Sequence, residues 1–222
     1  MAFEPVMPPY NISDPSATFL SSSCLDFLLI EIVPMAYRVT NELEAAAQQD
    51  PTSTSTSDDK AQQEQQNGGG ISSSETTETR KLLDEDEERD AVFYRLETLG
   101  YRVGQGLVER FSQNRPRQTD TLDVIKFVCK DLWTLVFRKQ VDNLKTNHRG
   151  VYVLTDNAFR PFSRMSAEAG GQAVLRAQPF LWFPCGIVRG ALAAMGINAT
   201  VQAETSELPG AVFQIKTIPT KS

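Results

Sequence analysis

The sequence predicts an α+β fold in which helices cover an antiparallel sheet. Apolar residues recur at three- and four-residue steps over several long segments, which is typical of amphipathic helices. Short β-prone segments occur in pairs separated by turn residues, which is typical of hairpins. Because the predicted order is helix, helix, helix, hairpin, helix, hairpin, the strands are expected to pair antiparallel.

The N-terminal part of the chain alternates between order and low complexity. Residues 1–20 are rich in proline and polar residues and are predicted to be a flexible tail, so that residues 21–222 form a single domain. Serines at 21–23 offer N-caps for a first helix over about 24–47. Residues 48–83 are polar and acidic and lack apolar periodicity, which predicts a disordered insertion between two helices.

The rest of the chain contains the remaining predicted elements. A third helix is expected to be capped by Thr119 or Asp120, and Gly196 is expected to end the last helix as its C′ residue. Asn147 to Gly150 read as a hairpin turn. The other helices are expected at about 80–111 and 180–195, and the strands at 140–146, 151–156, 199–203 and 211–218.

The charge distribution argues against a general nucleic-acid-binding role. The chain has 222 residues and a formal net charge of −6. Residues 58–90 hold eleven Asp or Glu and four Lys or Arg, a net charge of about −7, so the acidity belongs to one segment. Cys24, Cys129 and Cys185 are far apart and lie in apolar runs, which favours reduced thiols in a cytosolic protein.

The first helix has more apolar surface than one buried face requires. Phe27, Ile30 and Met35 lie outside its main stripe, and only Asp26 and Glu31 are charged between residues 24 and 37. Either this helix is buried on all sides in its own domain, or one face packs on the core and another on a partner protein. We favour the second interpretation. The main stripe is Leu25, Leu28, Leu29, Ile32, Ala36 and Val39.

Three glycines in the second helix indicate a close approach of another backbone. Gly100, Gly104 and Gly106 each cost roughly 1 kcal/mol against alanine in helix propensity, and close packing would compensate. A dinucleotide-binding loop is disfavoured because a helix precedes these glycines, where such a loop needs a strand. The residues predicted for the partner interface are Leu25, Leu28, Leu29, Ile32, Leu96, Leu99, Val103 and Gly104.

Few residues could carry catalysis. His148 is the only histidine and lies in a predicted turn, and no cysteine or histidine spacing indicates zinc. Cys185 begins an apolar helix, so a cysteine-based acyltransferase is one alternative, although a buried core thiol is preferred. An acyl-chain or small-molecule binding domain with an internal cavity near residues 180–185 is the other. Arg189 is expected to need a carboxylate or carbonyl partner and to fix helix-to-sheet packing.

Four separate segments resemble the small subunits of the TRAPP (transport protein particle) vesicle-tethering complex, and among them the subunit-six type. The resemblance covers the first helix and nearly everything over residues 90–216, and it assigns Cys185, Gly186, Arg189 and Gly190 to a shared structural motif. The four segments are GYRVGQ (100–105), LDVIKFVCKDLW (122–133), NLKTNHRGVYVL (143–154) and CGIVRGAL (185–192).

The resemblance implies a fold with a four-stranded antiparallel sheet on one side and helices on the other. It also implies heterodimerisation with the Bet-three-type subunit through the first two helices. It also implies contacts with other core and peripheral subunits. The assembled complex would act as a guanine nucleotide exchange factor for a Rab GTPase in ER-to-Golgi and Golgi traffic. This chain itself would be a non-catalytic scaffold without a cofactor, cytoplasmic and peripheral at Golgi and ER–Golgi membranes.

One departure from the family concerns lipid binding. The Bet-three relative carries an acylated cysteine shortly after its second helix, whereas residues 114–118 here contain no cysteine, which argues against acylation at that place. A membrane-facing surface would instead need basic residues on one face. Separate solvated charges are the preferred interpretation of the candidates, which are Arg115, Arg117, Arg138, Lys139, Lys145 and Arg149.

Overall fold

The computed structural model describes residues 21–49, 85–112, 120–147, 149–165 and 171–218. The predicted tail over 1–20, nearly all of the predicted insertion over 48–83, and His148 lie outside these residues. Only the first two residues of the predicted insertion are described, and they belong to the first helix.

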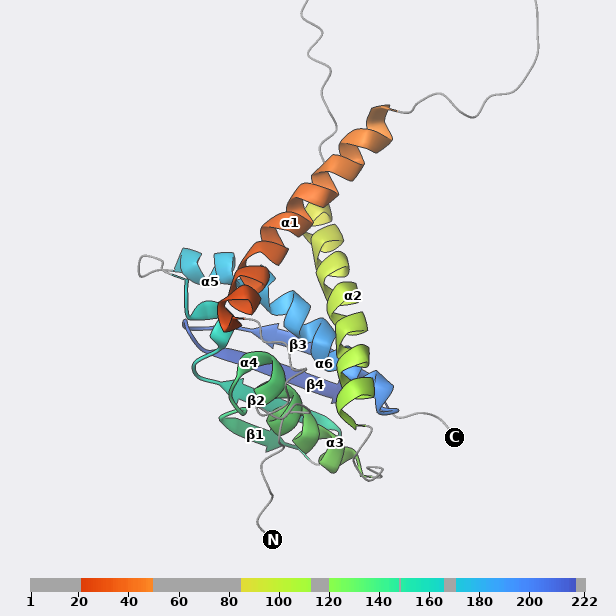
Figure 1. Ribbon diagram of the computed structural model, residues 1–222, viewed down its shortest axis with the longest axis vertical. Coiled ribbons are helices and arrows are strands. Elements are labelled where there is room, and N and C mark those ends of the chain that lie inside the picture. The colour runs from red at the N-terminus through yellow and green to blue at the C-terminus, as the bar shows by residue number, and fades with distance from the viewer. Residues whose placement is uncertain (1–20, 50–84, 113–119, 148, 166–170, 219–222) are drawn as a thin grey trace, which may run out of the picture.

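A four-stranded sheet forms one layer of the molecule (Figure 1). Its strand order is β1-β2-β4-β3, and every neighbouring pair is antiparallel, which confirms the predicted sheet. Because β4 lies between β2 and β3, the last strand of the chain joins the two hairpins into one sheet. The strands are β1 (Asn143–Thr146), β2 (Val151–Asp156), β3 (Ala199–Glu204) and β4 (Ala211–Thr217).

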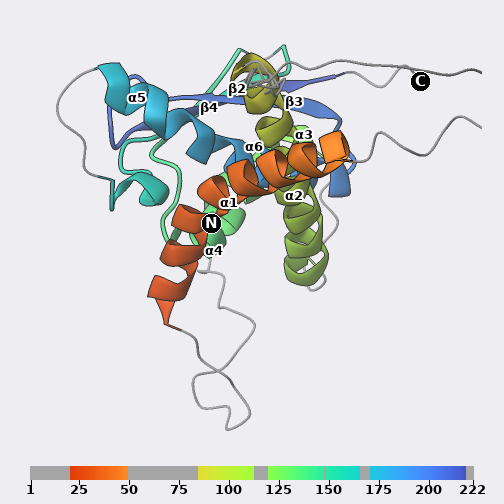
Figure 2. The same ribbon diagram turned by 90° about the horizontal axis from the view of Figure 1, so that it is seen from above.

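Side chains alternate across the sheet, so one face is apolar and the other polar. Leu154 of β2 pairs with Phe213 of β4, and both are fully buried on the helix-covered face. Gln214 and Lys216 of β4 point the other way and are exposed. Figure 2 shows most of the helical ribbon on one side of the sheet.

The helices of the described residues follow the predicted order. Ser21 caps the first helix, since its hydroxyl accepts from the backbone of Ser23 at 3.4 Å, and the Asp120 carboxylate caps α3 by accepting from Leu122 at 3.4 Å. Gly196 has φ of 83° just after α6, as predicted for its C′ residue. The helices are α1 (Ser22–Gln49), α2 (Glu85–Ser112), α3 (Thr121–Phe127), η1 (Val128–Leu132), α4 (Trp133–Phe137), α5 (Gly171–Ala177) and α6 (Trp182–Ala194), with 3-10 turns η2 (Arg160–Phe162) and η3 (Gln178–Leu181).

Two features of the helices differ from the prediction. The third predicted helix is a continuous run of α3, η1 and α4, in which η1 is a π-helical turn. The short helix α5 and the turn η2 were not predicted. Pro34 lies inside α1, where it removes one backbone hydrogen bond, and Figure 2 shows α1 bent between its two ends.

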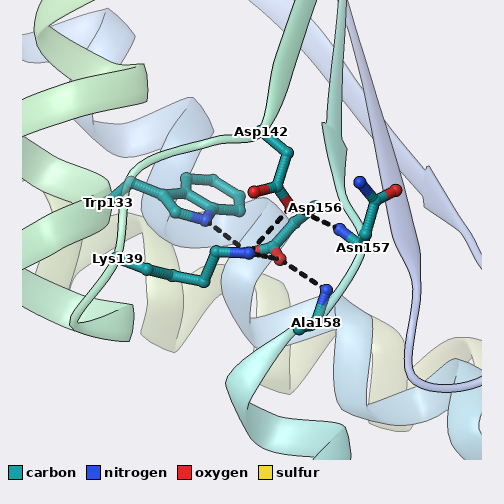
Figure 3. Close-up of polar contacts among 6 residues, drawn as sticks. All are labelled: Trp133, Lys139, Asp142, Asp156, Asn157 and Ala158. Carbon is teal, nitrogen blue, oxygen red and sulfur yellow. Dashed lines mark hydrogen bonds and ion pairs between the residues drawn. The ribbon is translucent and has the colours of Figure 1, made fainter.

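A buried carboxylate ties the β1–β2 hairpin to the start of α4 and to the residues just after it (Figure 3). Asp156 is fully buried, and its Oδ2 accepts from Trp133 Nε1 at 2.8 Å. Its Oδ1 accepts from Lys139 Nζ at 2.6 Å and from the backbone of Ala158 at 3.0 Å. Every oxygen of this buried carboxylate is therefore paired, which offsets the cost of its desolvation.

A second carboxylate completes this network from the start of β1 (Figure 3). Asp142 Oδ2 accepts from Lys139 Nζ at 2.8 Å and from the backbone of Asn157 at 2.7 Å. These two hydrogen bonds hold the pKa of Asp142 below its usual value, and the one from Lys139 has the larger effect. Lys139 is thereby shared between the two ends of the hairpin, which orients the sheet against the helical layer.

Candidate functional site

Helix α1 carries two apolar stripes, and only one of them is covered by the rest of the described chain. Leu29, Val33 and Ala36 are buried against the core. The second stripe follows steps of seven, four and four residues along the adjacent side of the helix. It consists of Leu28, Met35, Val39 and Leu43, whose exposed fractions are 56%, 40%, 36% and 51%.

The two ends of α1 are held differently. Near its start, Asp26 accepts from Arg160 Nε at 2.7 Å and from Arg164 Nη2 at 3.3 Å. The hydrogen bond from Arg160 is the main reason that the pKa of Asp26 lies below its usual value. At the other end, α1 crosses α2 and projects beyond the rest of the fold (Figure 1). Helix α1 is therefore anchored to η2 at its base.

A groove of about 460 Å³ lies where α1 crosses α2. Its floor includes Ile32, Leu96 and Leu99, and its rim includes Met35 and Tyr94, so the exposed stripe of α1 continues into it. The residues that line it are Ile32, Met35, Ala36, Val39, Ala91, Tyr94, Arg95, Leu96, Thr98, Leu99 and Arg102.

Helices α2 and α6 pack backbone against backbone. A Cβ atom on Gly100 would lie 2.2 Å from the carbonyl oxygen of Phe183, and one on Gly104 would lie 2.1 Å from that of Ile187. The predicted close approach is thus confirmed for Gly100 and Gly104. It is wrong for Gly106, because a Cβ atom there would meet nothing within 4 Å.

Glycines of the CGIVRGAL segment supply the other side of the same contact. A Cβ atom on Gly186 would lie 2.1 Å from the carbonyl oxygen of Glu97, and one on Gly190 would lie 2.0 Å from that of Tyr101. Both helices therefore use glycine where they cross, and no larger residue fits there without moving a backbone.

An ion pair closes this helix contact. Arg189 donates to Glu97 through Nε, and through Nη2 at 2.6 Å, and its guanidinium lies 4.4 Å from the centre of the Tyr101 ring. The hydrogen bond to Glu97 is the main reason that the pKa of Arg189 is raised. The predicted carboxylate partner is confirmed, but the pair joins α2 to α6 and does not fix a helix to the sheet.

The eight residues predicted for a partner interface fall into three groups. Leu28 and Val103 are exposed, and Leu25 and Leu99 are partly buried, so these four remain candidates. Ile32 and Leu96 line the groove floor, yet they are only 5% and 1% exposed because the core already covers them.

Two of the eight residues were wrongly placed on that interface. Leu29 is buried against the core, and Gly104 contacts the backbone of α6, so both act within the chain. Sequence reasoning missed the groove residues Tyr94, Arg95 and Arg102. The regular spacing of Val39 and Leu43 after Met35 was the signal that could have revealed the exposed stripe.

Cys185 lacks the surroundings of a nucleophile. Its side chain is buried against the core, and burial raises its pKa to about 12. Cys129 is also buried, with a pKa of about 12 for the same reason. A nucleophilic cysteine needs a lowered pKa and access to substrate, so this environment argues against the acyltransferase alternative.

A second hollow of about 460 Å³ lies where the start of α6 meets strands β2, β3 and β4. Trp182 and Cys185 contribute to its lining, as the alternative of an acyl-chain site near residues 180–185 would require. The residues that line it also include the polar Gln178, Gln202, Glu204 and Gln214. An acyl chain needs an apolar lining, so this hollow does not favour that alternative.

The basic residues considered for a membrane-facing surface are not all available to contact a membrane. Lys139 is committed to Asp142 and Asp156, whereas Arg138 and Lys145 are exposed. Arg115 and Arg117 lie outside the described residues. Within the described part of the chain, no helix is both long and apolar enough to cross a bilayer, and no three acidic, histidine or cysteine side chains gather as a metal site would need.

Comparison with known proteins agrees with this architecture. Residues 25–218 match the family model described as transport protein particle (TRAPP) component. Trafficking protein particle complex subunit 6b of Danio rerio is 52% identical over 130 residues, which is 59% of this chain and 82% of the relative. Human subunit 6B is 52% identical over 121 residues, 54% of this chain and 75% of the relative. Human subunit 6A is 48% identical over 120 residues, 54% of this chain and 74% of the relative.

A solved structure has a similar fold. It is that of trafficking protein particle complex subunit 3 from Naegleria fowleri, covalently bound to palmitic acid. The TM-score is 0.50 at 14% sequence identity, and the match covers 59% of this chain and 82% of the other. At this identity the likeness concerns the fold alone.

Proposed function

Because this chain belongs to the family of transport protein particle (TRAPP) components, we propose that it is a non-catalytic scaffold subunit that assembles through the exposed face of α1 and α2. The relatives at about half identity are named as subunits six of that complex, which supports assembly with other subunits. The partner that we propose for this face is a Bet-three-type subunit, in a heterodimer.

The observation that supports this proposal most strongly is the second stripe of α1. Leu28, Met35, Val39 and Leu43 are large apolar residues on one side of a helix, and the described part of the chain leaves them between 36% and 56% exposed. A contiguous apolar surface of this kind is typical of protein–protein interfaces. The groove beside it provides a concave surface for side chains of a partner helix.

The wider role is part of the same proposal. The assembled complex would act as a guanine nucleotide exchange factor for a Rab GTPase in ER-to-Golgi and Golgi traffic. This subunit would contact other core and peripheral subunits and would reside in the cytoplasm, at the surface of those membranes. We assign no catalysis to it, and the buried, high-pKa state of Cys185 supports that view.

The test is a pair of charges placed on the exposed stripe. Leu28→Asp with Met35→Asp should abolish copurification with the Bet-three-type subunit of the same organism. Full burial of a Leu or Met side chain stabilises by about 1.5–3 kcal/mol, so two half-exposed side chains together contribute about 2 kcal/mol. A buried, unpaired carboxylate costs several kcal/mol more. Ile32 is unsuitable for this test, because its burial means that a charge there would unfold the chain.

A matched control uses two exposed apolar residues elsewhere. Leu175 of α5 and Ile218 after β4 are 64% and 53% exposed, so Leu175→Asp with Ile218→Asp has the same charge and loses similar exposed apolar surface. The control pair should copurify as the wild type does. If the stripe variant still copurifies, or if only the control variant fails, the proposed interface is wrong.

A further inference from the structure

The groove between α1 and α2 has charge of one sign. Among its eleven lining residues, Arg95 and Arg102 are the charged ones, and both are cations on α2. They are seven residues apart, which places them on the same face of the helix and roughly 10 Å apart along its axis. On the α1 side, Arg38 is paired with Glu31 at 2.7 Å.

Arg95 is fixed along the groove wall by a buried threonine. Its Nε donates to Thr40 Oγ1 at 3.0 Å, and that hydroxyl donates to the carbonyl of Ala36 at 2.9 Å. Thr40 is 2% exposed, so this contact is built into the α1–α2 crossing. The stem of Arg95 is therefore held in place before any partner arrives.

Arg102 has no acceptor among the described residues. The positions three and four residues away on its helix are Thr98, Leu99, Gln105 and Gly106, so α2 itself provides no carboxylate for an i,i+3 or i,i+4 pair. Arg102 is exposed at the rim of the groove. The described part of the chain therefore leaves the guanidinium of Arg102 facing solvent.

Covering this groove would remove that guanidinium from solvent. An arginine buried without an acceptor costs several kcal/mol, whereas a carboxylate can accept two parallel N–H groups from it. A docking helix with an apolar or basic residue at this place would be rejected for that reason, even if its apolar surface fitted.

We propose that the α1–α2 groove selects a partner whose docking helix carries a carboxylate opposite Arg102, so that this arginine determines specificity and not only affinity. The inference rests on the proposed heterodimer and specifies the chemistry of its partner. Apolar contact along Leu28, Met35 and Val39 provides the area, and the Arg102–carboxylate pair fixes which helix docks and in which register.

The experiment compares charge reversals at matched sites. Dissociation constants for the purified Bet-three-type subunit would be measured by titration calorimetry for the wild type, Arg102→Glu, Arg102→Gln and Lys216→Glu, at low and high salt. Lys216 is exposed on β4 and does not line the groove, so Lys216→Glu makes the same charge change away from it. Circular dichroism would verify that every variant is folded.

Arg102→Glu should weaken binding roughly 30-fold or more, because one partner of a desolvated pair is lost and two like charges then face each other. Arg102→Gln should weaken it less and reduce its salt dependence. Lys216→Glu should bind as the wild type does.

Equal dissociation constants for Arg102→Glu and Lys216→Glu would overturn the inference and leave the heterodimer intact. A wild-type chain that does not bind the subunit at all would remove the proposed function and the inference together. A chain that forms a homodimer in sedimentation experiments, and that Arg102→Glu converts to a monomer, would assign the groove to a second copy and overturn the choice of partner.

Discussion

The substitution Gly104→Ala should destabilise the protein even though alanine is the better helix former. A Cβ atom at this position would lie 2.1 Å from the carbonyl oxygen of Ile187 and 2.9 Å from the backbone nitrogen of Ala191. Relieving the first contact to beyond 3.0 Å requires α2 and α6 to separate by about 0.9 Å. Both clashing atoms are backbone, so no side-chain rotation can absorb the added methyl group.

The magnitude follows from two opposing terms. Overpacking costs about 1–3 kcal/mol, and we place this contact at the upper end because the neighbours are rigid. The higher helix propensity of alanine stabilises the folded state by about 1 kcal/mol relative to glycine. The free energy of unfolding should therefore fall by about 2 kcal/mol. Gly106→Ala, two residues along the same helix, adds a methyl group with nothing within 4 Å and should raise it by about 1 kcal/mol.

The assay is urea unfolding of the two purified variants and the wild type, followed by circular dichroism with linear extrapolation. The free energies of unfolding of the two variants should differ by about 3 kcal/mol, with Gly104→Ala below the wild type and Gly106→Ala above it. If both alanines stabilise the protein, or both destabilise it equally, the backbone contact between α2 and α6 does not determine the effect of these glycines.

Two further predictions concern ionisable groups. Iodoacetamide at neutral pH should modify exposed Cys24 in the folded protein and spare Cys129 and Cys185, because burial raises the pKa of each of these two thiols to about 12. Intact mass spectrometry should therefore detect one adduct before unfolding and three after it. Modification of Cys185 in the folded state would contradict this prediction. The pKa of Asp26 is held below 3.8, chiefly by the hydrogen bond from Arg160, so its contribution to stability is present above that pH and is lost as pH falls through the lower folded value. Asp26→Asn should therefore weaken the acid-side decline of the unfolding midpoint, and an unchanged decline would refute the role given to this carboxylate.

Local patterns were sufficient for most of the fold. The β1–β2 hairpin, the helix cap at Asp120 and the Gly196 C′ residue each rest on backbone chemistry within a few residues. The hairpin and Gly196 were predicted, and Asp120 was one of the two caps expected. Helix α5 was missed because its seven residues hold too few apolar positions to show a period. The π-helical turn η1 leaves no mark in a sequence whose apolar residues are dense on every side.

The candidate site was predicted only in outline. Surplus apolar surface on the first helix was visible in the sequence, but its exposed part depends on how α1 lies on the core. Leu28 and Leu29 are adjacent, yet one is exposed and the other buried. Arg189 was expected to have a carboxylate partner, but Glu97 is 92 residues away and its contact depends on tertiary packing. In the sequence, Arg102 resembles any solvated charge, and only the structure shows that it lines the groove.

The backbone contact between α2 and α6 gives the groove two walls of unequal stiffness. Motion of α2 relative to α6 is resisted by main-chain atoms at Gly104 and Gly190, so a load applied to α2 passes to α6 and the sheet as to one solid body. Helix α1 rests on side-chain packing and on the clamp at Asp26. A shift of α1 would therefore need only side-chain repacking, whereas a shift of α2, which carries Arg102, would have to move backbone atoms.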